Sequence, residues 1–310
     1  MYCSVIIPIY NEEKSIKILI ARLLKVLDKL QAEYEIIFIN DGSNDNSLKI
    51  IESLIKINNK IKAISFRKNC GKSLALTCGF KFAKGEIIIT MDGDLQDLPE
   101  EIPKFISKIN EGFDMVSGWK KIRYDPKIFI IYSKFFNFVI NAFTGTKIHD
   151  TNCGFKAYRK YLVKHLNIYE GLFRFIPAIA KYEGFKIDEI VINHKPRIYG
   201  KSKYGLGKIF KGFYDLLALL FLLRYIKKPL HFYGFVGLVF LFSGFLINLY
   251  LSVLWIMGEH ISNRPLLFLG ILLMIIGFQS FSAGITAVMI SDISSKLDKN
   301  YPISKKIGEL

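Results

Sequence analysis

Residues 85–100 read GEIIITMDGDLQDLPE, an apolar run that ends in a cluster of acidic side chains. The run suits a strand of a parallel sheet covered on both faces, because such strands are apolar at nearly every position. Carboxylates this close together disfavour one another's ionised form unless a positive charge lies among them. The chain carries 43 Lys and Arg against 27 Asp and Glu, so a local excess of acid is unexpected. A metal ion, a helix N-terminus or water alone could accompany it.

Three earlier apolar runs resemble this one, and helical patterns separate them. The runs are Cys3–Ile9, Tyr34–Asn40 and Lys62–Arg67, and 3.6-residue periodicity marks Ser15–Leu30 and Asn46–Ile57. This alternation predicts a doubly wound α/β domain. Ligands of such sheets bind beyond the carboxyl ends of the strands.

Polar clusters follow three of the predicted strands. They are Tyr10-Asn11-Glu12, Asp41-Gly42-Ser43 and Asp92-Gly93-Asp94. Because the carboxyl ends of parallel strands lie at one edge of the sheet, we expect these clusters to meet in one crevice.

Asp92 and Asp94 lie two residues apart, and in an extended segment their side chains would face the same way. Gly93 would let the backbone approach a ligand closely. Two carboxylates suit Mg²⁺ or Mn²⁺, because such ions complete their shell with water and substrate phosphates. Gln96 could add an amide oxygen. The sequence therefore predicts a metal site, and a solvated turn without metal is the alternative.

Asp97 has a different predicted role from Asp92 and Asp94. It precedes Leu98-Pro99-Glu100-Glu101, and proline in a first helical turn with acids around it is typical of a helix N-terminus. We therefore expect Asp97 to cap a helix.

Residues 66–73, FRKNCGKS, end like a phosphate-binding P-loop. That motif needs glycine five residues before its Gly-Lys pair, and Phe66 stands there, so the match fails. Lys72 still opens a predicted helix after a strand, and we expect it to contact the phosphate or nucleotide part of a ligand.

Two uncharged segments near the C-terminus, Phe232–Met257 and Pro265–Ile290, are each long enough to cross a bilayer as a helix. The alternative is a pair of core helices in a soluble bundle. Lysine and arginine flank the pair on its outer ends, whereas Arg264 is the only lysine or arginine between the segments. The positive-inside rule therefore predicts cytoplasmic termini.

The predicted organisation is a cytoplasmic catalytic domain at 1–204, an amphipathic juxtamembrane segment at 205–230, two spans within 231–291 and a cytoplasmic tail at 292–310. Within the first domain, Pro126–Phe143 suits either a helix in the membrane interface or an ordinary buried helix.

The net charge of +16 fits a membrane surface better than nucleic acid, because many of the basic residues flank the spans. Four cysteines show no CxxC pairing, so structural thiols in a reducing compartment are expected.

Five motifs occur in an order that resembles family-2 glycosyltransferases of the GT-A fold, and within them the polyprenyl-phosphate glycosyltransferases. They are SVIIPIYNEE, INDGSNDNS, MDGDLQDLPE, DTNCGFKAYR and HKPRIYGKSKYG. The resemblance covers roughly residues 3 to 215 and implies a membrane enzyme that transfers a sugar.

The resemblance also implies roles for individual residues. Positions that line the base and ribose are Pro8, Tyr10, Glu12 and Asp41, which join Lys72 and Gly93 in the nucleotide-sugar site. Asp92 and Asp94 match the DxD motif that holds the metal on the diphosphate, and Gln96 matches its companion. Asp41 could bind uracil or guanine.

Further positions concern catalysis and the acceptor. Arg197 and Lys203 match a basic loop near the diphosphate, and Asp150 resembles an aspartate near the acceptor that orients first and acts as a base second. Arg123 resembles the arginine that meets the lipid phosphate, with Lys120 and Lys121 as rivals. Lys134 stands near a second acceptor arginine.

The implied reaction is inverting transfer from a nucleotide-sugar, with UDP preferred over GDP, to a polyprenyl phosphate at the cytoplasmic membrane. The acceptor phosphate is already ionised near pH 7, so no strong base is required and the histidines are expected to be structural. The alternative is a membrane scaffold with a degenerate glycosyltransferase domain. The sugar and the oligomeric state stay open, and small residues in the second span would allow close helix packing or a homo-oligomer.

Overall fold

The computed structural model describes residues 2–30, 32–121, 127–166, 170–193, 214–216, 219, 221, 229–258 and 265–297. The chain divides into two compact units, Met1–Leu219 and Leu220–Leu310.

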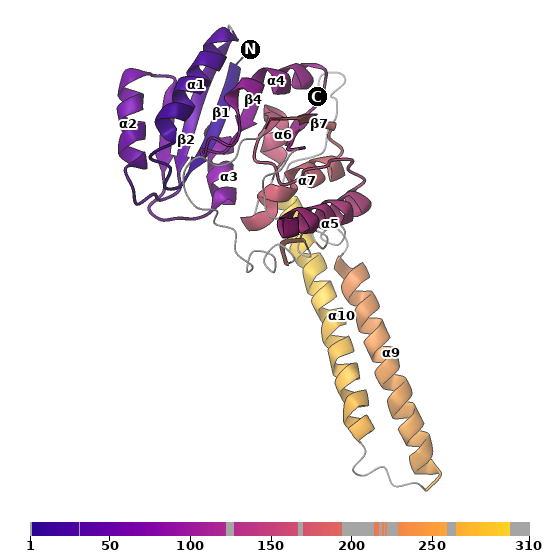
Figure 1. The fold of residues 1–310 in the computed structure, drawn as a ribbon. Helices are drawn as coiled ribbons and strands as arrows, with labels where there is room; N and C mark the ends of the chain where they lie inside the picture. Colours follow the sequence, from indigo (N-terminus) through magenta and orange to yellow (C-terminus); the bar gives the residue numbers. More distant parts are fainter. Residues whose placement is uncertain are drawn as a thin grey trace. The chain divides into compact units, whose positions relative to one another are not determined.

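A seven-stranded sheet forms the centre of the first unit (Figure 1). Its strands lie in the order β3-β2-β1-β4-β6-β5-β7. Its strands are β1 (Tyr2–Ile9), β2 (Glu33–Asn40), β3 (Ile61–Ser65), β4 (Ile87–Thr90), β5 (Met115–Trp119), β6 (Lys156–Arg159) and β7 (Ile187–Val191). The first four strands are parallel, as the sequence predicts, but β6 runs antiparallel to both β4 and β5. The sheet is therefore mixed, and the doubly wound part ends at β4.

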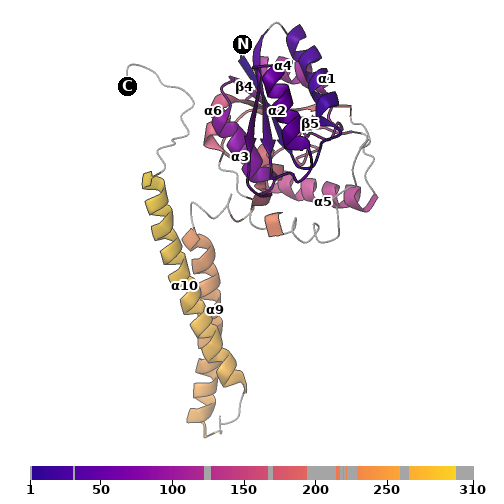
Figure 2. The ribbon, with the colours of Figure 1, turned by 90° about the vertical axis from the view of Figure 1, so that its left-hand side faces the viewer.

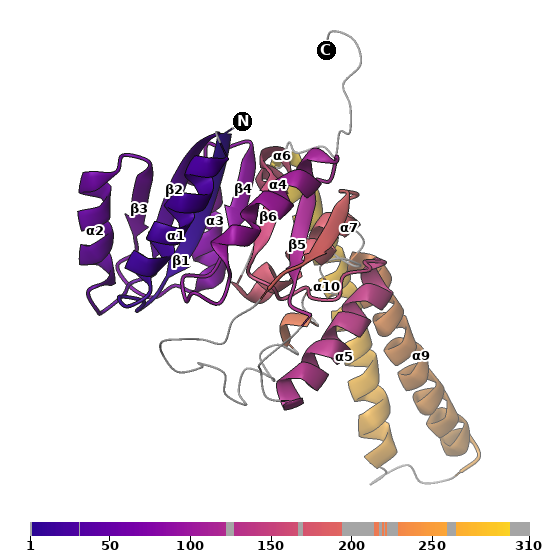
Figure 3. The same cartoon turned by 45° about the horizontal axis from the view of Figure 1, so that its top comes forward.

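Helices cover both faces of this sheet (Figures 1 and 3). They are α1 (Ile16–Lys29), α2 (Ser47–Ile57), α3 (Lys72–Phe82), the 3₁₀ turn η1 (Pro99–Glu101), α4 (Ile102–Asn110), α5 (Lys127–Thr144), α6 (Lys160–His165), the 3₁₀ turn η2 (Glu170–Phe175) and α7 (Ile176–Tyr182). Buried side chains of α1, α2 and α4 share one apolar core with β1, β2 and β4. The other face carries α3, where Gly79 lies directly on the side chain of Ile6.

Successive side chains of β1 point to opposite faces of the sheet, so this one strand contributes to the packing on both faces. Val5, Ile7 and Ile9 belong to the core with α1, whereas Ile6 faces α3. All four are buried, which is why the strand reads as a continuous apolar run.

Helix α5 occupies the segment for which the sequence left two environments open. Phe136 and Ile140 are buried, whereas Phe135, Phe138 and Phe143 are each more than half exposed. One face of the helix therefore packs on the domain and the other presents aromatic rings, which is the pattern of an interfacial helix.

The second unit contains a hairpin of two long helices, α9 (Pro229–Ile256) and α10 (Pro265–Leu297) (Figure 2). By length and hydropathy, Pro229–Ile256 and Pro265–Ile290 could each cross a membrane. The helices pack through glycines: a Cβ on Gly237 would lie 2.8 Å from the Gly277 carbonyl oxygen, and one on Gly244 would lie 2.6 Å from that of Gly270. The glycines of the second span thus serve packing within the hairpin.

Candidate active site

The polar clusters after β1 and β2 meet, as the sequence predicts. The Asn11 N–H donates to Ser43 Oγ at 3.0 Å, and the Asn44 N–H donates to Asn11 Oδ1 at 2.8 Å. Asn11 adopts a left-handed backbone conformation, with φ of 57°, that turns its side chain toward the second loop. Tyr10 and Glu12, beside it, are half-buried.

The third cluster joins the same edge through the end of β1. A Cβ on Gly93 would collide with the side chain of Ile9, and it would lie 3.5 Å from the Pro8 carbonyl oxygen. Gly93 therefore packs closely against the end of β1, and its approach to a ligand stays a prediction.

Asp41, at the end of β2, holds the loop that leads into α3. Its two carboxylate oxygens accept the N–H groups of Cys70 at 2.6 Å and Gly71 at 2.9 Å. Gly71 has a φ of 91°, a conformation that favours glycine, and Lys72 follows as the first residue of the helix. Asp41 thereby fixes the backbone from which Lys72 extends.

Lys72 forms an ion pair with Asp92, which links the start of α3 to the end of β4. A Cβ on Gly154 would lie 2.7 and 2.9 Å from the two Asp92 carboxylate oxygens and 2.9 Å from Lys72 Nζ. The pair therefore rests on the backbone of Gly154, where no larger residue fits without displacing it. The sequence singled out Lys72 and Asp92 but not Gly154, although the glycine lies in the DTNCGFKAYR motif.

The segment after β4 turns instead of continuing as an extended strand. Leu95 has a φ of 65°, and Asp94 Oδ1 accepts the Gln96 N–H at 3.2 Å. Because the chain turns at Gly93 and Asp94, the segment is not a continuous strand, and the shared orientation of the Asp92 and Asp94 side chains stays a prediction. Asp94 is buried, and Asp92 keeps about a third of its side chain exposed.

Asp97 is not a helix cap, contrary to the expectation from the sequence. The turn η1 begins at Pro99 with Leu98 before it, and Asp97 is fully buried beneath the Asp92 turn. Asp97 Oδ2 accepts the Asp92 N–H at 3.1 Å, and Oδ1 lies 3.0 Å from Lys120 Nζ. Lys120, a rival for the acceptor phosphate, is instead committed to this ion pair.

The carboxylates of Asp92 and Asp94 fit a hard divalent cation whose remaining ligands are water and substrate phosphates. Within the described residues, no group of three or more His, Cys, Asp or Glu side chains gathers as a metal site. Mg²⁺, however, is usually held by one or two carboxylates plus water and substrate phosphates. Asp92 already binds a cation, the Lys72 ammonium, in a cradle that a Cβ on Gly154 would fill.

Opposite charges tune the acid–base groups of this site. Burial alone would raise the pKa of Asp92, but the charges of Lys72, Lys120 and Lys156 outweigh it, and the pKa is lowered. Burial likewise opposes the charge on Lys72 and is outweighed by Asp92, so the pKa of Lys72 is raised. Both groups are therefore ionised at neutral pH.

Lys156, at the start of β6, was missed at the sequence level. It is 2% exposed, and its ammonium donates to the Thr151 carbonyl oxygen at 3.1 Å. Burial, reinforced by the charge of Lys72, lowers the pKa of Lys156 to about 8. A lysine in a run such as GFKAYR gives no sign of burial, because lysine is almost always a surface residue.

The loop that carries Asp150 is held between β5 and α5. Asn137 on α5 donates to the His149 carbonyl oxygen at 2.6 Å and accepts from Thr151 Oγ1 at 2.7 Å. Asp150 itself is 2% exposed. His149 stacks on Trp119 at 4.1 Å between ring centroids and pairs with Glu189, in keeping with a structural histidine.

The structure does not test several predicted residues. Arg123, Arg197 and Lys203 lie outside the described residues. Lys134 is exposed on α5.

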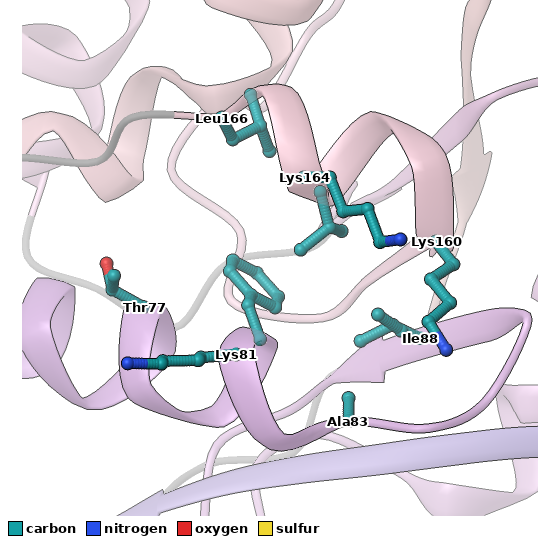
Figure 4. A pocket seen from close by; sticks show the side chains of 9 residues that line it. Thr77, Lys81, Ala83, Ile88, Lys160, Lys164 and Leu166 are labelled. Atoms are coloured by element: carbon teal, nitrogen blue, oxygen red, sulfur yellow. The ribbon is translucent and has the colours of Figure 1, made fainter. Parts of the chain in front are cut away.

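A separate hollow lies between α3 and α6 (Figure 4). Its lining residues are Thr77, Phe80, Lys81, Ala83, Ile88, Lys160, Val163, Lys164 and Leu166. It contains no carboxylate and none of the predicted site residues, so the candidate site is the edge formed by the ends of β1, β2 and β4.

A mixed α/β sheet with paired carboxylates after its fourth strand is the arrangement of a GT-A glycosyltransferase, and comparisons with known proteins agree. The model of the family described as Glycosyl transferase family 2 matches residues 4–166. The chain therefore belongs to glycosyl transferase family 2, and it is a transferase, as the motifs predict.

Two curated relatives resemble nearly the whole chain. A dodecaprenyl-phosphate galacturonate synthase of Rhizobium johnstonii is 34% identical over 93% of this chain and 87% of its own. An undecaprenyl-phosphate 4-deoxy-4-formamido-L-arabinose transferase of Proteus mirabilis is 35% identical over 98% and 94%.

Among solved structures, glucosyl-3-phosphoglycerate synthase of Mycobacterium tuberculosis, in complex with Mn²⁺, UDP and phosphoglyceric acid, matches with a TM-score of 0.56 at 16% identity. It covers 71% of this chain and 78% of its own. At that identity the likeness confirms the predicted fold.

Proposed function

We propose that this protein transfers a sugar from a nucleotide-sugar to a polyprenyl phosphate at the cytoplasmic membrane, with inversion at the anomeric carbon. A UDP-sugar is the preferred donor and a GDP-sugar the alternative. The names of the curated relatives support the acceptor class, because both act on polyprenyl phosphates. The observation that carries the proposal is the Asp92 carboxylate, held at the end of β4 with a cation already on it.

The donor would lie across the ends of β1, β2 and β4. Pro8, Tyr10 and Glu12 would line the base and ribose. Asp41 accepts two backbone N–H groups, and a carboxylate has further lone pairs for a base N–H. Asp92 and Asp94, with Gln96, would hold Mg²⁺ or Mn²⁺. The glucosyl-3-phosphoglycerate synthase structure of the same fold contains Mn²⁺.

Charge on the leaving nucleoside diphosphate is what the site has to stabilise. A bound metal supplies Lewis-acid stabilisation of that charge. Lys72, and in the proposal Arg197 and Lys203, add fixed positive charge around the same phosphates. Asp150, buried beside Lys156, orients the acceptor region.

The acceptor would reach the site from the bilayer. The apolar helices α9 and α10 would anchor the chain as a two-span hairpin, and the exposed aromatic face of α5 suits the membrane interface. Arg123 and Lys134 would attract the lipid phosphate. The lysines and arginines that flank the spans favour a cytoplasmic catalytic domain in the inner membrane.

The test is transfer into lipid. Purified full-length protein with Mn²⁺ is incubated with radiolabelled UDP- and GDP-sugars, with and without undecaprenyl phosphate, and label is followed into the organic phase. Label that requires lipid and disappears in Asp94→Ala is the expected result, and it names the sugar. A folded wild-type protein that transfers nothing and binds no nucleotide would contradict the proposal and favour the membrane scaffold.

A further inference from the structure

We propose that Lys72 is a resident cation that occupies Asp92 until the divalent metal arrives, so that metal and nucleotide diphosphate bind cooperatively. The inference rests on the proposed function and adds an order to it. Free metal competes with the ammonium for one carboxylate, whereas metal accompanied by a diphosphate does not.

The Asp92 carboxylate already holds one cation on the side that faces Gly154. Its Oδ1 is paired with Lys72 Nζ, and the backbone of Gly154 closes on both carboxylate oxygens and on Nζ. A metal would approach within about 2.1 Å of a ligand oxygen. An ammonium on the same carboxylate would then lie close to a divalent ion, and because like charges repel, the proposal is that the metal displaces the ammonium.

The pair is accessible, so this exchange needs no opening of the fold. Lys72 is 27% exposed and Asp92 is 32% exposed in their side chains. The lysine stem is flexible, whereas its backbone is fixed, because Asp41 holds the N–H of the preceding Gly71. The displaced ammonium therefore stays within a side chain's reach of the ends of β2 and β4.

The diphosphate of the donor supplies the missing partner. Without it, a metal at Asp92 leaves the Lys72 ammonium beside a dication with no anion of its own. With it, the metal and the ammonium each gain phosphate oxygens. Metal alone must therefore break the Lys72–Asp92 ion pair in order to bind. Metal that arrives with a nucleotide binds more tightly, because the Lys72 ammonium then pairs with the diphosphate.

Coupling of this kind is reciprocal, since metal must raise nucleotide affinity by the same factor by which nucleotide raises metal affinity. Allosteric couplings are commonly about 5- to 150-fold. Removing the Lys72 ammonium should therefore reduce the effect of nucleotide on metal affinity and the effect of metal on nucleotide affinity by the same factor.

The experiment titrates Mn²⁺ into detergent-purified full-length protein and measures free Mn²⁺ by electron paramagnetic resonance, without nucleotide, with UDP and with GDP. Lys72→Met is compared with wild type and with Lys81→Met, an exposed lysine on the same helix. Lys72→Gln is a second variant, and melting temperatures check the fold of each.

Wild type and Lys81→Met should bind Mn²⁺ weakly alone and about 10-fold or more tighter with nucleotide. Lys72→Met and Lys72→Gln should bind Mn²⁺ alone about 10-fold tighter than wild type and lose most of the coupling. Unchanged or weaker Mn²⁺ binding by both folded variants without nucleotide overturns the inference.

Asp92→Asn separates this inference from the proposed function. If Asp92→Asn abolishes Mn²⁺–nucleotide binding but the Lys72 variants bind as wild type does, the proposed metal site stands. That result overturns only the exchange between Lys72 and the metal. Wild-type protein that binds no Mn²⁺ even with either nucleotide removes the proposed metal site, and the inference with it.

Discussion

Lys72, the first residue of α3, is ion-paired with Asp92 at the end of β4, and so two crossover connections of the sheet meet at one contact. Asp41, at the end of β2, holds the residue before Lys72. The ends of β2 and β4 and the start of α3 are therefore tied together by one chain of interactions. Changes around this contact should alter ligand binding more than stability.

Gly154→Ala tests that separation. The new methyl would lie within 3 Å of both Asp92 oxygens and of Lys72 Nζ, which are the far ends of flexible side chains. The pair can move aside, so we expect a stability loss of only about 1 kcal/mol but a loss of transfer activity of about 10-fold or more. Melting temperature and lipid-linked label are measured together.

The matched control is Gly234→Ala in α9, where a Cβ would make only ordinary contacts of 3.6 and 3.7 Å. It should leave both quantities unchanged. A Gly154→Ala protein with wild-type activity would show that the cradle does not position Asp92.

Strands β1 to β4 and several helices of the first unit were predictable, because continuous apolar runs and helical periodicity mark them in the sequence, whereas β5, β6 and β7 were not among the predicted strands. Val5, Ile6 and Ile7 are apolar in succession since helices cover both faces of β1. The position of Asp92 just after β4 followed from the same pattern, and its role in ligand binding stays a prediction.

Other features depend on partners distant in the chain. Asp97 has the local sequence of a helix cap, but Lys120 at the end of β5 draws it into a buried ion pair. The antiparallel direction of β6 is equally hidden, since a four-residue strand carries no mark of its direction. Gly154 matters only because Asp92 and Lys72 fold onto it.

The Asp97–Lys120 pair should stabilise the turn that carries Asp92. Asp97→Leu leaves Lys120 buried without its carboxylate and the Asp92 N–H without its acceptor. We expect a cost of about 3–5 kcal/mol, measured as a lower urea midpoint.

The double variant Asp97→Leu/Lys120→Met should recover much of that stability, because no uncompensated charge remains. It should not recover activity, since the Asp92 turn still lacks its anchor. A double variant as unstable as Asp97→Leu alone would contradict the ion pair as the cause.

Glu35, away from the site, should govern acid stability. It is 1% exposed and accepts hydrogen bonds from Ser4 Oγ at 2.7 Å, the Lys84 N–H at 2.7 Å and Lys62 Nζ at 2.5 Å. Burial alone would raise the pKa of Glu35, but these donors outweigh it, and the pKa lies below its ordinary value of 4.5.

A lowered folded-state pKa means that Glu35 stabilises the fold fully above pH 4.5 and loses that contribution as the pH falls through the folded-state pKa. Glu35→Gln should lower stability at pH 7 by about 1–3 kcal/mol and flatten the decline between pH 5 and 3. Melting temperatures across that range check it. Parallel curves for wild type and variant would exclude Glu35 as the titrating group.

Gly277→Leu should separate the two long helices. A Cβ at this position would lie 2.6 Å from the Leu241 nitrogen and 2.7 Å from the Gly237 carbonyl oxygen, and backbone atoms cannot rotate away. In the proposed membrane hairpin, helices pair chiefly by close packing, so the lost approach has no compensation.

Hydrogen–deuterium exchange in peptides of α9 and α10 should rise in Gly277→Leu. Ala283→Leu, a small-to-large change at an exposed position of the same helix, should leave exchange unaltered. Equal exchange in wild type and Gly277→Leu would mean that the glycine contact does not hold the hairpin together.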